Sequence, residues 1–301
     1  MRTEQTREDF RKVIKSIVRG VYDVQKLRIQ TGNRVVANFR AKLGIPPGKE
    51  DSKEIKRMMR LLKADYDKIT DAIVAKSKLM TDFPGTELIS SFTEYALMDF
   101  YLNMIEREAA LFHDLKRIVE AQPLWKNFLQ DVKGCGPAMA GVILAEIDIY
   151  NAKYPSSLWK YAGLDVALDG KGRSRRKEHL IKVKYKDKNG EDKEKDSITF
   201  NPFLKTKLMG VLAGSFLKAK SPYRELYDGY KHRLEHHAVY GKKEETPGHR
   251  HNMALRYMVK RFLVDLHTNW RRIEGLPVHE EYAVAKLGYT HGQGVATTAA
   301  Q

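Results

Sequence analysis

The sequence predicts a mainly α-helical protein, in which a helical bundle or coiled-coil arm is followed by a helix-hairpin-helix domain with a small inserted β-hairpin. Three observations lead to this prediction. Apolar residues recur every three or four positions through the first 120 residues, which is the period of an amphipathic helix. A Gly-Cys-Gly-Pro turn at 134–137 precedes a run of small apolar residues. Finally, Asn189-Gly190 separates two strand-like stretches, which is a strong signal for a β-hairpin turn.

The N-terminal arm covers residues 1–120 in this prediction. Its apolar stripe, which includes Ile14, Val21 and Val35, is interrupted twice by glycine and proline, so three helices are expected. Long amphipathic helices need an apolar partner surface. We therefore expect the arm to join copies of the chain into a homo-oligomer.

The second half of the chain divides at a change in composition. We expect a second domain at 121–277, with its β-hairpin near 179–200. The last segment, 278–301, is rich in Gly, Ala and Thr, and this composition predicts a flexible tail.

The composition limits the class of protein. The chain has 301 residues with 54 Lys and Arg against 38 Asp and Glu, a net charge of +16 and a pI near 9.6, as nucleic-acid-binding proteins often have. No apolar run approaches the roughly 18 residues that a membrane span requires. We therefore expect a cytoplasmic protein without a membrane partner. Cys135 is the single cysteine, which excludes an internal disulfide, and we expect its side chain to be buried.

The turn at Gly134 to Pro137 predicts a phosphate contact. Glycine permits positive φ and close backbone approach, and proline suits the first position of a helix, whose free amides and dipole favour an anion. The alternative is an ordinary tight turn between two helices. The DNA contacts expected here are Lys133, Gly134, Gly136 and Ala138.

A strongly basic loop follows the hairpin region. Residues 170–186 contain eight basic residues and one acidic residue, and such a cluster favours phosphate contacts without base specificity. Alternation of apolar and basic residues then predicts a basic β-ribbon, with Ser197 to Phe200 in the returning strand. A solvated charged loop is the alternative. The DNA contacts expected in this loop are Lys171, Arg173, Arg175, Arg176 and Lys177.

We expect no metal site and no cofactor. The carboxylates of the arm fit a solvated helix face, because a metal site needs acids that converge from rigid elements. A histidine-rich patch is sterically able to bind zinc or copper, but no cysteine or well-placed acid completes it. These histidines therefore fit the surface or phosphate contacts. The patch comprises His232, His236, His237, His249 and His251.

Three motifs occur in a recognisable order: Lys133 to Ala140, Leu158 to Leu164 and Gly170 to Arg176. Over residues 125–275 they resemble the C-terminal domain of insertion-sequence 110-type transposases. The N-terminal acidic RuvC-like domain of that family is not recognisable here. The resemblance implies a basic helix that begins at Asn201 and carries Lys205, both candidate DNA contacts.

The resemblance also implies that Ser174 is the serine that attacks DNA in that family. The family places glycine after its serine, whereas Arg175 follows here. The neighbouring cations cannot accept the hydroxyl proton, and the sequence does not show that either Glu178 or His179 bends back toward it. From sequence alone we therefore expect no covalent adduct between the chain and DNA.

Three functions are consistent with these observations. The preferred one is a DNA-binding protein, related to transposases of mobile elements, that grips the duplex backbone without cutting it. The second is an active transposase or site-specific recombinase that uses Ser174, which would require Mg²⁺. The third is a protein that binds structured RNA or serves as an interaction protein of a phage or mobile element.

Overall fold

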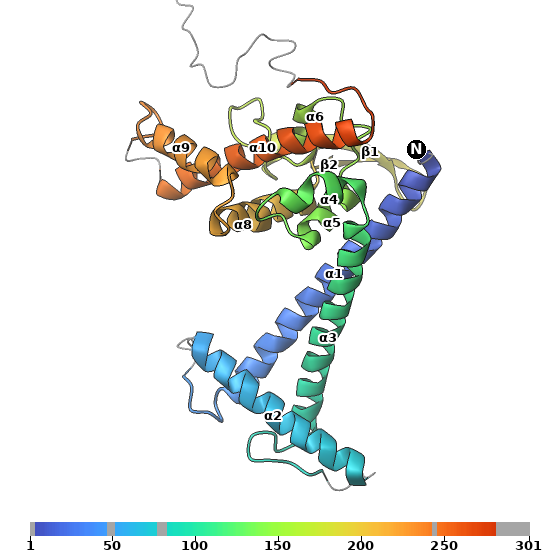
Figure 1. Cartoon of the computed structure of the whole chain (residues 1–301), viewed down its shortest axis with the longest axis vertical. Coiled ribbons are helices and arrows are strands. Elements are labelled where there is room, and N and C mark those ends of the chain that lie inside the picture. The colour runs from blue at the N-terminus through green and yellow to red at the C-terminus, as the bar shows by residue number, and fades with distance from the viewer. Residues whose placement is uncertain (1–3, 47–51, 77–82, 243–245, 281–301) are drawn as a thin grey trace, which may run out of the picture. The chain divides into compact units, whose positions relative to one another are not determined.

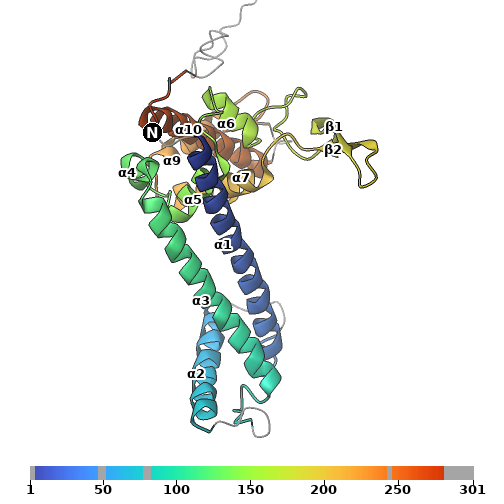
Figure 2. The same ribbon diagram turned by 90° about the vertical axis from the view of Figure 1, so that its right-hand side faces the viewer.

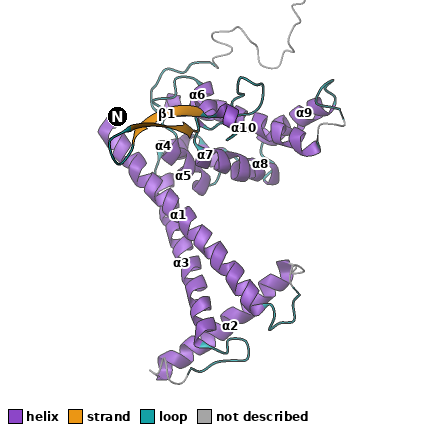
Figure 3. Cartoon of the chain, turned by 180° about the vertical axis from the view of Figure 1, so that it is seen from behind, coloured by secondary structure: helices purple, strands orange, loops and turns teal. Residues whose placement is uncertain are grey.

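The computed structural model describes residues 4–46, 52–76, 83–242 and 246–280. Within these residues the chain is mainly helical, with one antiparallel two-stranded hairpin (Figures 1 and 3). This confirms the predicted fold class. The predicted tail falls almost entirely on residues 281–301, which lie outside the described ones.

The chain divides into two compact units. One unit is Ser16 to Leu115, and the other combines residues 1–15 with 116–301. The boundaries therefore fall inside the first and third helices, and the first fifteen residues belong with the C-terminal part of the chain.

The unit at 16–115 is built from three helices: α1 (Glu4–Phe39), α2 (Ser52–Lys76) and α3 (Phe92–Glu120). Apolar side chains of all three form its core, as the periodicity predicts. The helix expected after Pro84-Gly85 begins only at Phe92, because the Ser91 hydroxyl accepts the Glu94 amide at 3.3 Å and caps it there. The core residues are Val35, Phe39, Met58, Leu62, Ile69, Ile73, Ile89 and Met98.

The centre of the other unit is α5 (Pro137–Glu146), whose residues from Met139 onward are all buried. A helix that is apolar all round belongs in a core. Before it lie α4 (Pro123–Asn127) and a 3-10 turn, so the helix expected ahead of the glycine turn is two short pieces. After it comes α6 (Pro155–Tyr161).

The β-hairpin consists of β1 (Ile181–Lys186) and β2 (Asp192–Ser197), and it stands away from the helices (Figure 2). The returning strand was expected at Ser197 to Phe200 and instead ends at Ser197. Its three carboxylates, Asp192, Glu194 and Asp196, face lysines of β1 across the hairpin, and Lys182 lies 3.0 Å from Asp196. Residues 181–197 contain six lysines and five carboxylates, so the ribbon is nearly neutral rather than basic.

Helices complete this unit. A nearly continuous helical segment consists of α7 (Pro202–Lys207), a π-helical turn and α8 (Ala213–Lys218). It is followed by α9 (Tyr223–Glu235) and α10 (Pro247–Ile273). The last of these helices begins at Pro247, because the Thr246 side chain accepts the His249 amide and caps it there. It packs against α9, α6 and α4.

Candidate nucleic-acid interface

The glycine turn is held against α8. Gly134 has φ +97°, and a Cβ there would lie 3.0 Å from the Phe216 ring. The Ser215 hydroxyl donates to the Gly134 carbonyl at 2.7 Å. The glycine at this position is therefore required for packing inside the protein, whatever the turn binds.

Gly136 is different, because a Cβ at this position would meet nothing within 4 Å. It is the N-cap of α5, whose first amides have no partner in the helix itself. Lys133 is exposed, Ala138 is half-buried, and Cys135 is buried with a thiol pKa raised to about 12 by desolvation. The open side of the turn therefore lies at Gly136, next to an exposed cation.

The basic loop is shaped by its own backbone. Val166 and Gly172 form an antiparallel bridge, and the Arg173 amide donates to the Asp165 carbonyl at 3.1 Å. This brings Arg173 Nε to 2.9 and 2.8 Å from the two oxygens of the Asp165 carboxylate. Arg173 is therefore half-buried and fixed in an ion pair.

Two further cations lie close to the ion pair of Arg173 and Asp165. Lys205 Nζ donates to the Arg173 carbonyl at 2.5 Å and lies 4.7 Å from the centre of the Phe200 ring. The Arg256 guanidinium lies over Gly172, where a Cβ would come within 1.9 Å of Nη1. We call Arg173, Lys205 and Arg256 the cation cluster.

The cation cluster carries excess positive charge in a desolvated place. Burial, together with the nearby Arg256, lowers the pKa of Lys205 to about 8, and burial also lowers the pKa of Arg256. Among the residues that the structure describes, Asp165 is the carboxylate whose charge favours the protonated forms of both. Three cations around one carboxylate are unfavourable by themselves, so an anion bound there would stabilise them.

Ser174 follows the cation cluster directly. Its Oγ lies 3.0 Å from Nδ1 of His179, and its backbone amide donates to the same nitrogen at 2.9 Å. His179 Nε2 lies 3.1 Å from Oδ2 of Asp169. The sequence does not show a base beside this hydroxyl, but the structure places His179 there.

The remaining predicted contacts fall into two groups. Lys171, Arg175, Arg176 and Lys177 are exposed around the loop. The Asn201 side chain instead accepts the Leu204 amide at 3.0 Å and donates to the buried Glu146 at 2.5 Å. This side chain therefore caps α7 and fixes it to α5.

The glycine turn and the cation cluster contact different parts of the helical segment formed by α7, the π-helical turn and α8. The turn contacts Ser215, whereas Lys205 lies ten positions earlier, which is about 15 Å at 1.5 Å per residue. The structure therefore offers two separate candidate contacts with a phosphate backbone.

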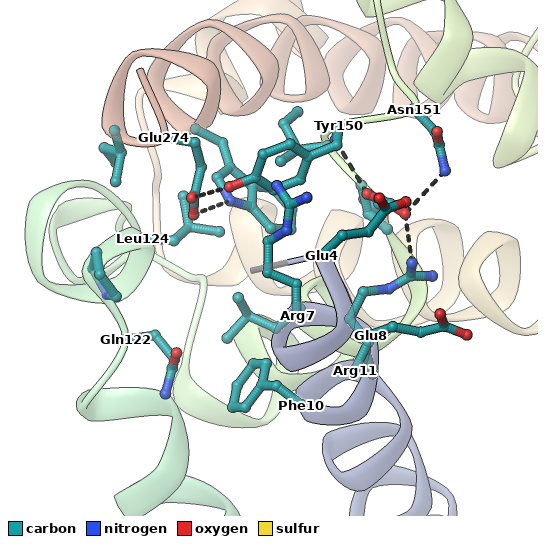
Figure 4. A pocket seen from close by; sticks show the side chains of 18 of the residues that line it. Glu4, Arg7, Glu8, Phe10, Arg11, Gln122, Leu124, Tyr150, Asn151 and Glu274 are labelled. Carbon is teal, nitrogen blue, oxygen red and sulfur yellow. Dashed lines mark hydrogen bonds and ion pairs between the residues drawn. The ribbon is translucent and has the colours of Figure 1, made fainter. Parts of the chain in front are cut away.

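A pocket of about 890 Å³ lies in the same unit (Figure 4). Two of its cations have partners: Arg11 binds Asp148 at 2.6 Å, and the Arg7 guanidinium lies 3.5 Å from the centre of the Tyr150 ring. The Tyr150 hydroxyl donates to Glu274 at 2.5 Å. These two cations already have a carboxylate or an aromatic partner, whereas in the cation cluster three cations share one carboxylate.

Within the described parts of the chain, no three His, Cys, Asp or Glu side chains are grouped as metal ligands. There the rings of His232 and His236 lie 4.3 Å apart, and both are exposed. None of the helices in those parts is both long and apolar enough to cross a membrane.

The sequence analysis does not identify three residues of the candidate interface: Asp165, Asp169 and Arg256. Arg256 lies on α10, far along the chain from the loop, and its helical position resembles that of any surface arginine. Asp169 and His179 lie on either side of the basic residues 171–177. Their contact depends on the 3-10 turn at Lys177 to His179, which the sequence does not predict. Comparisons with protein-family models, curated proteins and solved structures give no match.

Proposed function

We propose that this chain binds duplex DNA through its phosphate backbone. The observation that carries the proposal is the cation cluster, in which three half-buried cations surround one carboxylate. A phosphate is the anion that fits best, because arginine guanidinium groups pair with its oxygens in a fixed geometry.

The surroundings favour a polyanion over a single phosphate. Four exposed cations flank the cation cluster in the loop. The glycine turn offers a second contact near Ser215 of α8, and the whole chain carries a charge of +16. Backbone contacts of this kind give affinity without sequence preference. The resemblance to the transposase C-terminal domain supports DNA rather than RNA.

Two substitutions with opposite expected effects test this proposal. Arg256→Gln removes a cation from the cation cluster, so duplex affinity should fall about tenfold. Asp165→Asn removes the competing carboxylate, so duplex affinity should rise while the free energy of unfolding falls. Fluorescence anisotropy with a labelled random-sequence duplex measures the affinities. Equal affinity of both variants and the wild type would contradict the proposal.

A second candidate function is DNA strand transfer by Ser174, as the transposase resemblance implies. The specific observation in its favour is the 3.0 Å separation between the Ser174 hydroxyl and His179. It predicts a protein–DNA adduct that resists denaturation and disappears in Ser174→Ala. A binder without this chemistry would show salt-sensitive affinity and no adduct.

A further inference from the structure

We infer that Ser174 is an activated nucleophile whose proton passes to His179, and that Asp169 positions His179 for this transfer. The inference deepens the second candidate function and rests on the proposed function, because bound nucleic acid supplies the phosphodiester that the serine attacks. Its basis is the hydrogen-bonded chain from Ser174 through His179 to Asp169.

The contacts of the imidazole define which nitrogen is the base. Nδ1 of His179 receives the backbone N–H of Ser174 at 2.9 Å, so this nitrogen carries a lone pair and no proton. The ring proton is then on Nε2, which lies 3.1 Å from Asp169 Oδ2. In this tautomer the imidazole turns its basic nitrogen toward the serine and its N–H toward a carboxylate, which are the roles found in serine triads.

The environment fixes this arrangement. The His179 side chain is 1% exposed, and that of Asp169 is 35% exposed. The Arg176 amide donates to Ser174 Oγ at 3.3 Å, so the hydroxyl hydrogen remains available to Nδ1. The Lys171 amide holds Asp169 at 2.9 Å and, with His179, lowers the pKa of its carboxyl group. The carboxylate that orients the imidazole thus stays ionised.

The cation cluster defines the substrate class. Lys205 Nζ contacts the carbonyl that immediately precedes Ser174, and Arg256 lies over Gly172. A phosphodiester held by these cations lies within two residues of the serine, where they also stabilise the negative charge of the transition state.

The chemical step conserves atoms and charge. Ser174 Oγ forms a bond to phosphorus as its proton moves to His179 Nδ1, and the bond from phosphorus to one ester oxygen breaks. That oxygen takes the proton from the imidazolium and leaves as a hydroxyl-ended strand. The other strand end remains on Ser174 as a phosphodiester.

A fluorophosphonate probe tests the activation separately from DNA binding. It reports an activated serine because Oγ displaces fluoride from phosphorus. We expect the full chain in EDTA to gain one adduct on Ser174, detected by intact-mass and peptide mass spectrometry. Ser174→Ala should lose this adduct, whereas the control Ser156→Ala should keep it. An absent adduct, or one on another residue, would overturn the inference.

Two variants test the base and its positioning residue. His179→Gln keeps an oxygen acceptor for the Ser174 amide but cannot take a proton, and Asp169→Asn removes the charge that orients the ring. Each should lower the maximal labelling rate about 100-fold, the usual scale for a general base, with the half-saturating probe concentration, melting temperature and duplex affinity retained. Unchanged labelling in His179→Gln would refute the role of the base.

A labelled duplex then tests the substrate class. We expect a denaturation-resistant adduct with the wild type and none with Ser174→Ala. Normal duplex binding and probe labelling without a DNA adduct would overturn the phosphodiester assignment. Failure of duplex binding with intact probe labelling would instead contradict the proposed function and leave the activation of Ser174 standing.

Discussion

Lys205 links the proposed DNA contact to pH. Its pKa is lowered to about 8 by burial and by Arg256, and a bound phosphate requires its protonated form. Duplex affinity should therefore fall as the pH rises through 8, whereas Lys205→Arg should keep its affinity, because arginine stays charged. Anisotropy titrations from pH 7 to pH 9 measure the difference. A parallel fall in both proteins would show that another group titrates.

The same lysine has the opposite effect on stability. An unfolded lysine titrates near pH 10.4, so between pH 8 and that value the unfolded chain holds a proton that the folded chain has released. The contribution of Lys205 to the free energy of unfolding therefore rises with pH over this window.

Gly136 separates the stability of the turn from its proposed contact with phosphate. Asp and Asn are both good N-cap residues, and a Cβ meets nothing there, so both variants should melt near the wild-type temperature. Gly136→Asp should nevertheless weaken duplex binding about tenfold by repelling phosphate, and Gly136→Asn should weaken it much less. Identical affinities for the two variants would remove Gly136 from the interface.

At the scale of elements, the loop and the ribbon differ in how many of their cations face a carboxylate. The three lysines of β1 face carboxylates across the hairpin. The loop cations Arg175, Arg176 and Lys177 are exposed. Replacing these three loop residues with Ala should flatten the dependence of log K on log salt by about 0.9 for each lost contact.

The matched control replaces three ribbon lysines, Lys182, Lys184 and Lys186, with Ala. Their cross-strand partners are Asp196, Glu194 and Asp192, so their charges are largely neutralised already. The salt slope should move much less than in the loop variant. A larger effect from the ribbon would place the DNA contact there.

How much the sequence predicts also depends on the element. The helices follow from apolar periodicity, and the hairpin turn follows from Asn189-Gly190. The returning strand was misplaced because Ser197 to Phe200 has strand-like residues, while the true strand is charged and is stabilised by pairing with β1. Two of the three residues of the cation cluster, Arg173 and Lys205, were predicted. Arg256 was not, because it reaches Gly172 only through tertiary packing.

At the scale of the whole molecule, the residues of the candidate site all lie in one of the two compact units. The unit at 16–115 exposes apolar side chains on its helices, among them Leu27, Leu61 and Phe100, and assembly of copies through the arm stays a prediction. The other unit contains the cation cluster, the glycine turn and Ser174. The proposed activity therefore belongs to the unit formed by residues 1–15 and 116–301.

The salt dependence of binding to duplex DNA tests the central claim most directly. The wild-type chain should bind two unrelated random-sequence duplexes with equal affinity, and log K should fall linearly with log salt, with a slope of about −0.9 for each phosphate contact. In the double variant Lys205→Gln, Arg256→Gln, the slope should become flatter by the amount expected for about two lost phosphate contacts. Affinity that does not respond to salt, or tighter binding to structured RNA than to either duplex, would contradict the account.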